Sequence, residues 1–467
     1  MSNVIVLVES HYRSRTWFAA LKNIGLTHII SVMPEEFIIF KNAGISSSNI
    51  LNLYFDAKSD VMKGKTLAFY ERFLETKFNS IVFMDRTLRK QKKIYIENYL
   101  IFLVNKIDNF FKEIKPNIIF IEPTWTHEIL ICKFAKKYNV PIVAPVKDKL
   151  LPDRFLAFKD ENHITFYTKQ KTNKAKSFSV EALNMVIKDK PVQYFKKFNN
   201  RNSLDFRKIP KLYRLIKISL FNYRNPNIQN SFFSDILIKI QSIIRSKLQL
   251  TFIRFKKLKE IKNKYILITL HVQPEASIDV VGTKYSNQIE FVRSLANTAP
   301  FNYIILVKEH SHAIGNRPFA FYQNLLEIPN VILLHPNENA RKAIQGASLV
   351  VSNTGTSSLE AGILNIPAVT ATPMFFHKIM LKYQFNPFEE NISDLLNKKL
   401  KLNKTLLISN LKEIYNGSFD GNCGDFQTDH NVLSETNIKD LESSFKSIIQ
   451  EIKQSIWDKI WVQKKIL

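Results

Sequence analysis

The chain has 467 residues, 45% of them hydrophobic, and a formal net charge of +26. This length exceeds one ordinary core and predicts two domains of about 200 residues each, while the apolar content excludes wholesale disorder. No apolar stretch approaches the ~20 residues that span a bilayer, and two cysteines exclude a disulfide framework or a cysteine zinc site, so we expect a reduced, cytoplasmic protein.

The first part of the chain alternates short β-rich runs with helical patterns. Residues 4–8 are too few for the core of a signal peptide and are followed at once by Glu9, so we predict them as the first strand. Apolar side chains recur at helical spacing in residues 127–138. Strand–helix–strand alternation predicts a parallel sheet with helices on both faces, here a Rossmann-like domain at residues 1–185. Its other strands are predicted at residues 28–32, 50–54, 117–121 and 141–145.

Polar side chains follow three of these strands, at the edge where parallel sheets bind ligands. His11 follows the first strand, Glu122 follows the strand at 117–121, and Asp148 follows the strand at 141–145. A carboxylate in such a position can act as a general base toward a hydroxyl. Each carboxylate could equally belong to a structural ion pair.

Positive charge is concentrated in the middle of the chain, in a predicted linker of basic helices at 186–262. Residues 190–264 contain nineteen Lys and Arg against three acids, a net charge of +16. Aromatic side chains alternate with cations there, which is typical of amphipathic helices on an anionic membrane surface. Nucleic acid could bind a similar mixture, but no nucleic-acid motif is present. Solvated helices bridging two domains are the alternative.

We therefore expect residues 190–264 to hold the protein at the periphery of the inner membrane, without a nucleic-acid partner. The C-terminal part at 426–467 is predicted as helices. Its segment 441–467 carries Trp457 and Trp461 and is basic and amphipathic. This segment could pack across the first domain or touch the membrane.

The second half repeats the alternation of strands and helices more clearly. It predicts a doubly wound α/β domain at 263–425, with ligands beyond the carboxyl ends of its strands. The fold class predicted for the whole chain is thus α/β, with two Rossmann-like doubly wound domains facing a central cleft. The strands of the second domain are predicted at 265–271, 302–307, 330–334, 348–352 and 367–372, with helices between them at 288–297, 318–327, 338–346 and 357–364.

A hydroxyl-rich stretch lies at a strand-to-helix junction of this second domain. Gly355 falls where a tight turn must lead into the helix, among Thr354, Thr356, Ser357 and Ser358. The unpaired N–H groups and positive dipole end of a helix N-terminus bind anions, and hydroxyls add donors, so we favour a phosphate site. A plain N-cap by Thr356 or Ser357 is the alternative.

Charged residues follow a neighbouring predicted strand. Lys308 and His310 would point to one side if the strand alternates, and would offer charge and a hydrogen-bond donor to a phosphate. His310 and His312 also have the spacing of a metal-binding pair, but no carboxylate cluster accompanies them, so no metal or other cofactor is expected. Arg317 is either a second anion clamp or a surface cation.

Three groups thus start at strand ends of one predicted sheet. Gln273 and Glu275 follow its first strand, and Glu360, one turn into the helix after the hydroxyl-rich stretch, could reach ribose hydroxyls or be a solvated residue. We expect the three groups to converge on one crevice. G-x-S-x-G, Walker A and G-x-G-x-x-G motifs are absent, which argues against hydrolase, ATPase and dehydrogenase functions.

Four stretches in this order resemble the capsule polysaccharide biosynthesis proteins, a group that includes bacterial Kdo transferases and has a GT-B-type glycosyltransferase fold. P-x-R-F at 152–155 resembles the N-terminal half of the same family. The resemblance covers residues 265–375 well and 1–160 loosely, and leaves the basic middle segment uncovered. The four stretches are Q-P-E at 273–275, K-E-H with a following Arg at 308–317, I-P-N-V at 328–331, and T-G-T-S-S-L-E-A with I-P at 354–367.

The resemblance implies a metal-independent glycosyltransferase. Its C-terminal domain would bind a nucleotide-activated sugar, for example a CMP-linked one, and its N-terminal domain a surface or capsular glycan, free or lipid-linked. Asp148 aligns with the family's acidic residue and would be the base. Two positions depart from the family's pattern: Ser311 replaces the proline of His-Pro, and Asn365-Ile366-Pro367 replaces Gly-Lys-Pro, which bears on the loop near Glu360.

Two other functions fit the same residues. A transferase of phosphopolyol units from a CDP-activated donor would use a similar site of histidine and hydroxyls. A non-catalytic, membrane-associated scaffold of polysaccharide assembly would bind no nucleotide and would not depend on His310.

Overall fold

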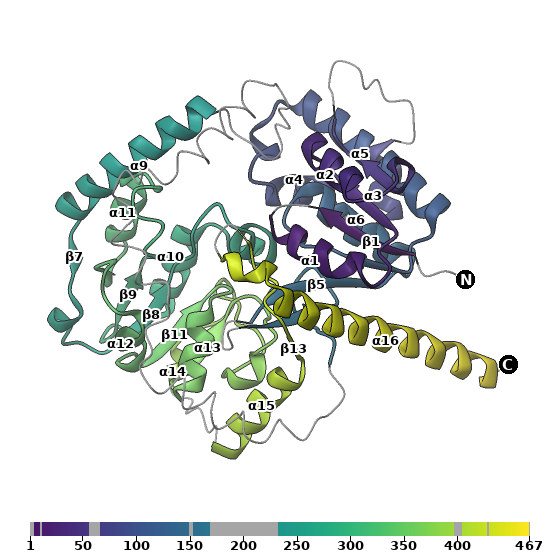
Figure 1. Cartoon of the computed structure of the whole chain (residues 1–467). Helices are drawn as coiled ribbons and strands as arrows, with labels where there is room; N and C mark the ends of the chain where they lie inside the picture. The colour runs from purple at the N-terminus through teal and green to yellow at the C-terminus, as the bar shows by residue number, and fades with distance from the viewer. Residues whose placement is uncertain are drawn as a thin grey trace. The chain divides into compact units, whose positions relative to one another are not determined.

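The computed structural model describes residues 4–9, 12–55, 66–148, 153–168, 232–396, 404–426 and 429–466. The chain forms two compact units, each with a sheet flanked by helices (Figure 1). The predicted α/β class with two doubly wound domains is confirmed, whereas the central cleft stays a prediction. The first unit comprises Met1–Ala175, Asn225–Gln229 and Glu413–Leu467, and the second comprises Lys176–Arg224 and Asn230–Lys412.

The sheet of the first unit has the strand order β13-β6-β5-β4-β1-β2-β3. Strands β1 to β5 pair in parallel, while β6 runs antiparallel to β5 and to β13. All five residues of β1 are buried, as expected for a strand covered on both faces. The strands are β1 Ile5–Glu9, β2 His28–Ser31, β3 Ile50–Asn52, β4 Ile118–Phe120, β5 Ile142–Lys147, β6 Arg154–Phe158 and β13 Ser418–Asp420. The helices are α1 Tyr12–Lys22, α2 Pro34–Asn42, α3 Leu67–Phe73, α4 Phe78–Met84, α5 Lys93–Ile114, α6 Thr126–Lys137 and α16 Glu435–Ile466.

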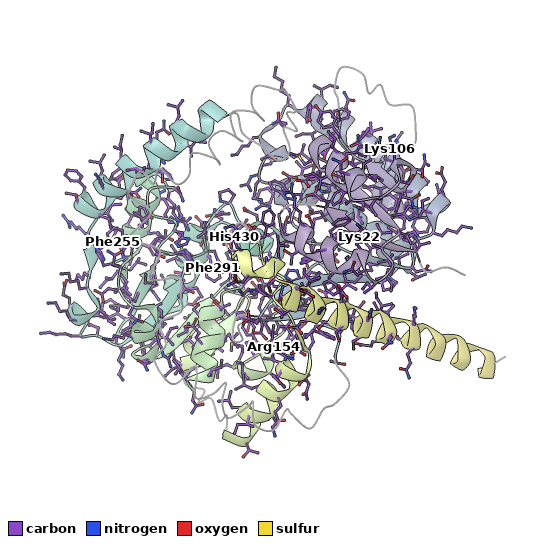
Figure 2. All side chains as sticks on the ribbon, viewed as in Figure 1. Lys22, Lys106, Arg154, Phe255, Phe291 and His430 are labelled. Atoms are coloured by element: carbon purple, nitrogen blue, oxygen red, sulfur yellow. The ribbon has the colours of Figure 1, made fainter. Side chains whose placement is uncertain are left out.

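Strand β13 extends the first sheet beyond β6, although the sequence grouped residues 263–425 as one domain. Arg154 of β6 ties the two strands together (Figure 2). Its Nε donates to Ser418 Oγ at 2.8 Å, and its guanidinium forms an ion pair with Asp420. The arginine of the P-x-R-F stretch therefore holds the sheet edge together.

Helix α16 packs on the same unit. Leu441, Phe445, Ile448 and Ile452 recur at helical spacing and are buried in the core that contains Leu7 and Phe120. Of the two expectations for residues 441–467, packing on the first domain is therefore confirmed for this part. The side chains of Trp457 and Trp461 lie outside those the structure describes.

The sheet of the second unit has the order β12-β11-β8-β9-β10-β7, and its strands pair in parallel. All five predicted strands of this half are present. The strands are β7 Phe255–Lys256, β8 Tyr265–Thr269, β9 Ile304–Lys308, β10 Val331–Leu334, β11 Leu349–Ser352 and β12 Ala368–Thr370. The helices are α9 Phe232–Phe252, α10 Gln288–Thr298, α11 Phe319–Leu326, α12 Ala340–Gln345, α13 Thr356–Ile363, α14 Ser393–Leu396 and α15 Lys404–Asn416, whose last residues pass into the first unit.

The direction in which strands are added reverses between β8 and β11. The chain steps from β8 to β9 and β10, then crosses back to β11 and continues to β12. Because such connections are right-handed, α10 and α11 cover one face, where Phe291 lies in the core (Figure 2), and α12 and α13 cover the other. The carboxyl ends of β8 and β11 therefore form a topological switch point, where open α/β sheets bind ligands.

The basic middle segment is only partly described. Residues 190–231 lie outside the described ranges, residues 232–252 form α9, and Phe255 and Lys256 form β7 rather than continuing a basic amphipathic helix. Phe255 packs against the core while Lys256 is exposed, so the aromatic–cation alternation at this point is that of an edge strand. None of the helices in the described ranges is long and apolar enough to cross a membrane.

Candidate functional site

The three groups singled out in the sequence begin side by side at the switch point of the second sheet. Thr269 ends β8 and pairs with Lys308 at the end of β9 and with Ser352 at the end of β11. The loops that follow these strands therefore leave from one edge of the sheet. The backbone pairing of these three strand ends therefore fixes the distances between the three loops.

Helix α13 begins without a side-chain cap. Its N-cap is Gly355, so the alternative of a plain N-cap by Thr356 or Ser357 is wrong. The φ of Gly355 is −74°, and a Cβ there would lie 3.0 Å from the Cβ of Ser352. Close approach, rather than a left-handed turn, thus explains this glycine. The first N–H groups of an α-helix have no partner within the helix, so this end can accept an anion.

The four hydroxyls of the predicted phosphate loop divide into two pairs. Thr354 donates to the carbonyl of Ser277, and Ser358, which is fully buried, donates to the carbonyl of Val369. These two hydroxyls are occupied by the protein. Thr356 and Ser357 are partly exposed on the first turn of α13, and Ser357 Oγ lies 2.5 Å from Thr269 Oγ1.

His271 joins the β8 loop to the β11 loop, a role that the sequence did not assign. The backbone N–H of Thr354 donates to His271 Nε2 at 3.3 Å. Burial, with smaller contributions from His310 and Arg317, lowers the pKa of His271 to about 4. The ring is therefore neutral at pH 7, and its Nε2 is an acceptor.

His310 is arranged as a hydrogen-bond donor. The N–H of His312 donates to His310 Nδ1 at 3.2 Å. His310 is exposed by its surface area, yet desolvation by its neighbours, then the charges of His312, Lys308 and Arg317, lower its pKa to about 4. A neutral imidazole whose Nδ1 accepts carries its proton on Nε2. His310 can therefore give one hydrogen bond to a ligand without bringing a positive charge, and His312 serves by fixing the tautomer.

Lys308 is buried and already has two partners. Its Nζ donates to the carbonyl of Pro336 at 2.7 Å and to the carbonyl of Glu309 at 3.1 Å. Burial lowers the pKa of Lys308 to about 8, although Glu309 and Glu338 act in the opposite direction. One ammonium hydrogen remains for a ligand, and water screens the charge little because the side chain is buried.

Arg317, predicted as an anion clamp or a surface cation, is neither exposed nor unpaired. Its Nε donates to Glu309 Oε2 at 2.6 Å, and its Nη2 donates to the carbonyl of His271 at 2.5 Å. Tyr322 OH also donates to Glu309 Oε2, at 3.1 Å. Burial raises the pKa of Glu309, and Arg317 opposes that shift. The pair fixes the loop after β9 against the loop after β8.

Gln273 and Glu275 shape the β8 loop. Gln273 Nε2 donates to Asp279 Oδ1 at 2.9 Å, and Gln273 Oε1 accepts from Gln288 Nε2 at 3.0 Å. The N–H of Glu275 donates to Asp279 Oδ2 at 3.1 Å, while its side chain is exposed. The roles of Asp279 and Gln288 could not be predicted from the sequence. Gln288 begins a predicted helix, Asp279 lies between predicted elements, and neither belongs to a motif.

Glu360 faces Arg341 of α12. Burial raises the pKa of Glu360, and Arg341 acts in the opposite direction. The Nη2 of Arg341 is buried and has no hydrogen-bond partner among the described residues. An acceptor and a donor are thus available near the beginning of α13, suited to hydroxyl groups.

The candidates of the first unit lie near the switch point between β1 and β4 of its own sheet. Glu9 ends β1 and is buried, and burial together with Glu36 raises its pKa well above the ordinary value. Glu122 follows β4 and is partly exposed, and Asp148 follows β5 and is buried. His11 lies outside the described residues. From the sequence, Glu9 was named only as the charged residue that follows the first strand, and its burial is what distinguishes it.

Within the described ranges, no three His, Cys, Asp or Glu side chains are grouped so that they could hold a metal ion. No family model matches the chain, and no curated protein matches it. Solved structures similar to the chain include two from Thermosulfurimonas dismutans that carry the name KpsC. One, a beta Kdo 2,7 transferase, has a TM-score of 0.34, 15% identity, and a match covering 74% of this chain and 90% of that chain. The other, a beta Kdo 2,4 transferase, has a TM-score of 0.30, 10% identity, and coverage of 66% and 82%.

A UDP-GlcNAc 2-epimerase from Methanocaldococcus jannaschii is also similar, with a TM-score of 0.24, 13% identity, and coverage of 86% of this chain and 94% of that chain. All three TM-scores are below 0.5 and all three identities below 25%. These similarities therefore say nothing about which substrates this chain uses.

Proposed function

We propose that the chain is a metal-independent glycosyltransferase that moves a sugar from a nucleotide-activated donor, such as a CMP-linked sugar, to a surface or capsular polysaccharide acceptor. One observation carries the proposal. The uncapped N-terminus of α13, with the Thr356 and Ser357 hydroxyls, shares the switch point of a parallel sheet with the Nε2–H of His310. His271 links the two loops, since its Nε2 accepts from the N–H of Thr354 and its carbonyl accepts from Arg317 in the loop that carries His310. The sequence resemblance to capsule polysaccharide proteins supports the same class.

This arrangement fits the phosphate of a departing nucleotide. As the bond between the anomeric carbon and the phosphate oxygen breaks, its electron pair and negative charge pass to the phosphate. The helix N-terminus, the two hydroxyls and the His310 donor are fixed in place, so they stabilise that charge without reorganising. Lys308 adds a full positive charge, and Glu360 with Arg341 would take the ribose hydroxyls.

The first unit would supply the acceptor side. A base there takes the proton of the acceptor hydroxyl as its oxygen attacks the anomeric carbon. Asp148 is the first choice, and Glu122 and His11 are the other candidates. The anionic inner-membrane surface remains the proposed partner of residues 190–264, which would bring the enzyme to a lipid-linked acceptor.

A donor screen with purified protein and mass spectrometry tests the function. Release of CMP, UDP or GDP from a nucleotide sugar, with transfer to a glycan acceptor, is expected. Turnover of CDP-glycerol without turnover of any nucleotide sugar would establish the phosphopolyol transferase instead. A protein that binds no nucleotide, and whose His310→Ala variant still supports polymer production in cells, would be the scaffold.

A further inference from the structure

Helix α9 of the second unit has its polar side toward the protein and its apolar side away from it. Toward the protein lie Ser242, Arg245, Ser246 and Gln249, at the i, i+3, i+4, i+7 spacing of one helix face. A surface helix of a globular domain ordinarily presents an apolar stripe to the core. The reversed arrangement indicates that the apolar side of α9 meets something other than the described residues of its own unit.

The polar side of α9 holds the loop that carries His310 and Arg317. Gln249 is fully buried, and its Nε2 donates to the carbonyl of Arg317 at 2.7 Å while its Oε1 accepts from the N–H of Gly315 at 2.9 Å. Two turns earlier, Ser242 Oγ donates to Asn316 Oδ1 at 2.9 Å. Figure 1 shows α9 on the side of the second unit that carries α11, which begins just after this loop.

Gly315 brings the loop and helix into direct backbone contact. Its φ is +85°, a conformation that favours glycine, and a Cβ there would lie only 2.2 Å from the carbonyl oxygen of Ser242. No other residue type fits without moving α9. From this contact the path to the site is short, because Arg317 continues to Glu309 and to the carbonyl of His271. A displacement of α9 must therefore move the loop of the candidate site.

The apolar side of α9 forms what we call the outer stripe, Leu237, Ile240, Ile244 and Leu248. These side chains recur at helical spacing, and their exposed fractions are 57%, 50%, 55% and 42%. Ile243 and Phe252 are also exposed, on the two flanks of the stripe, and Ile238 is exposed on the side of Ser242. A run of apolar side chains this long on one helix face marks an interaction surface.

The charge beside the outer stripe identifies its partner. Directly after α9, six exposed cations surround one acid, Glu260. Exposed isoleucine and leucine next to clustered Lys and Arg match a surface with an apolar interior and anionic head groups. A second protein copy would place this positive cluster near its own duplicate, which like charges oppose. The cations are Arg254, Lys256, Lys257, Lys259, Lys262 and Lys264.

We propose that the outer stripe of α9 inserts into an anionic lipid surface, and that Gln249, Ser242 and Gly315 transmit this docking to the loop of the candidate site. The second part rests on the proposed function of that loop. Lipid docking would then order the His310 loop where a lipid-linked acceptor is found. In this proposal, one face of α9 contacts lipid and the opposite face contacts the loop, so membrane binding positions the loop.

Vesicle binding tests the docking without any nucleotide or sugar. The full chain should co-sediment with vesicles of phosphatidylglycerol and phosphatidylcholine, and less with phosphatidylcholine alone. The double change Ile240→Gln, Ile244→Gln should lower the partition coefficient about 30-fold or more, because two apolar side chains lose their burial. Phe301→Gln is the matched control: Phe301 is 92% exposed and lies in the loop between α10 and β9 of the same unit, and its loss should leave binding unchanged.

Hydrogen exchange tests the coupling. In wild-type protein, exchange in a peptide spanning 310–318 should slow when anionic vesicles are added. In Gln249→Leu, vesicle binding should persist while this slowing is lost. Absence of slowing in vesicle-bound wild-type protein would refute the coupling, whether or not the enzyme proves to be a glycosyltransferase.

Three results would overturn the docking itself. First, the wild type and the double variant could bind anionic vesicles equally well. A change from dimer to monomer in the double variant, with vesicle binding unchanged, would assign the stripe to a second copy. A lower melting temperature with unchanged vesicle binding would show that another part of this chain covers it.

Discussion

Lys308→Met should change how the stability of the second unit depends on pH. Burial lowers the pKa of Lys308 from 10.5 to about 8. Below pH 8 the side chain is charged in both the folded and the unfolded chain, so the full cost of burying the charge is present. Between pH 8 and 10.5 the unfolded chain binds more protons, so stability rises with pH. Above 10.5 the side chain is neutral in both states and the cost is gone.

The size of this effect follows from the shift. A pKa difference of about 2.5 units corresponds to roughly 3 kcal/mol, most of it recovered by pH 10. A methionine side chain at this position cannot titrate, so the variant lacks this rise. The variant also loses the hydrogen bonds to Pro336 and Glu309, but that loss is independent of pH and cancels when two pH values are compared.

Urea unfolding followed by circular dichroism at pH 7 and pH 10 provides the assay. The wild type should gain about 2–3 kcal/mol relative to Lys308→Met between these values. Lys262→Met, at an exposed position, is the control and should follow the wild type. If the difference between wild type and Lys308→Met were the same at both pH values, Lys308 would not carry a buried charge, and its role beside the donor phosphate would fail with it.

Three further predictions test other parts of the structure. Glu309→Gln should cost about 3–5 kcal/mol, because it leaves the buried charge of Arg317 without its carboxylate partner. Glu327→Gln, at an exposed position, should leave the thermal midpoint unchanged. Ser358→Ala should lower the free energy of unfolding by about 1–3 kcal/mol, because it leaves a buried acceptor unsatisfied. Ser357→Ala should weaken nucleotide binding in calorimetry with little change in melting temperature. The reverse pattern would contradict the assignment of Ser358 to the protein interior and of Ser357 to the ligand. Phe445→Ala should cost about 3–5 kcal/mol in urea unfolding, and a change below 1 kcal/mol would mean that α16 does not complete the first core.

The sequence predicted the regular part of the fold well, because buried parallel strands are short apolar runs bounded by turn residues. The five strands of the second half and the helices between them follow from that pattern. Strand β7 was missed because its two residues, Phe255 and Lys256, lie in a basic run where charge dominates. Strand β13 was not predicted, and its residues were grouped with the second domain, because pairing with β6 across more than 250 residues leaves no local signal.

The candidate site was likewise predicted only in part. Residue types at strand ends were enough to find the loops after β8, β9 and β11, because parallel strands end at one edge. Residue types alone did not distinguish side chains that face a ligand from side chains that hold the loops in place. Arg317 and Ser358 look like anion donors in the sequence, and only burial and hydrogen-bond partners show that each is occupied within the protein. Glu309 was part of the K-E-H stretch but was given no role, because its partners Arg317 and Tyr322 lie eight and thirteen residues further along the chain.

Nucleotide binding measured by calorimetry tests the central claim most directly. Wild-type protein should bind at least one of CMP, UDP and GDP or their sugars. His310→Ala should weaken that binding about 10-fold or more, the loss of one hydrogen bond to a charged phosphate, without a change in melting temperature. The pKa of His310 is about 4, so the affinity should not change between pH 6 and 8 through this group. Failure of the wild type to bind any nucleotide, or equal binding by His310→Ala, would contradict the account.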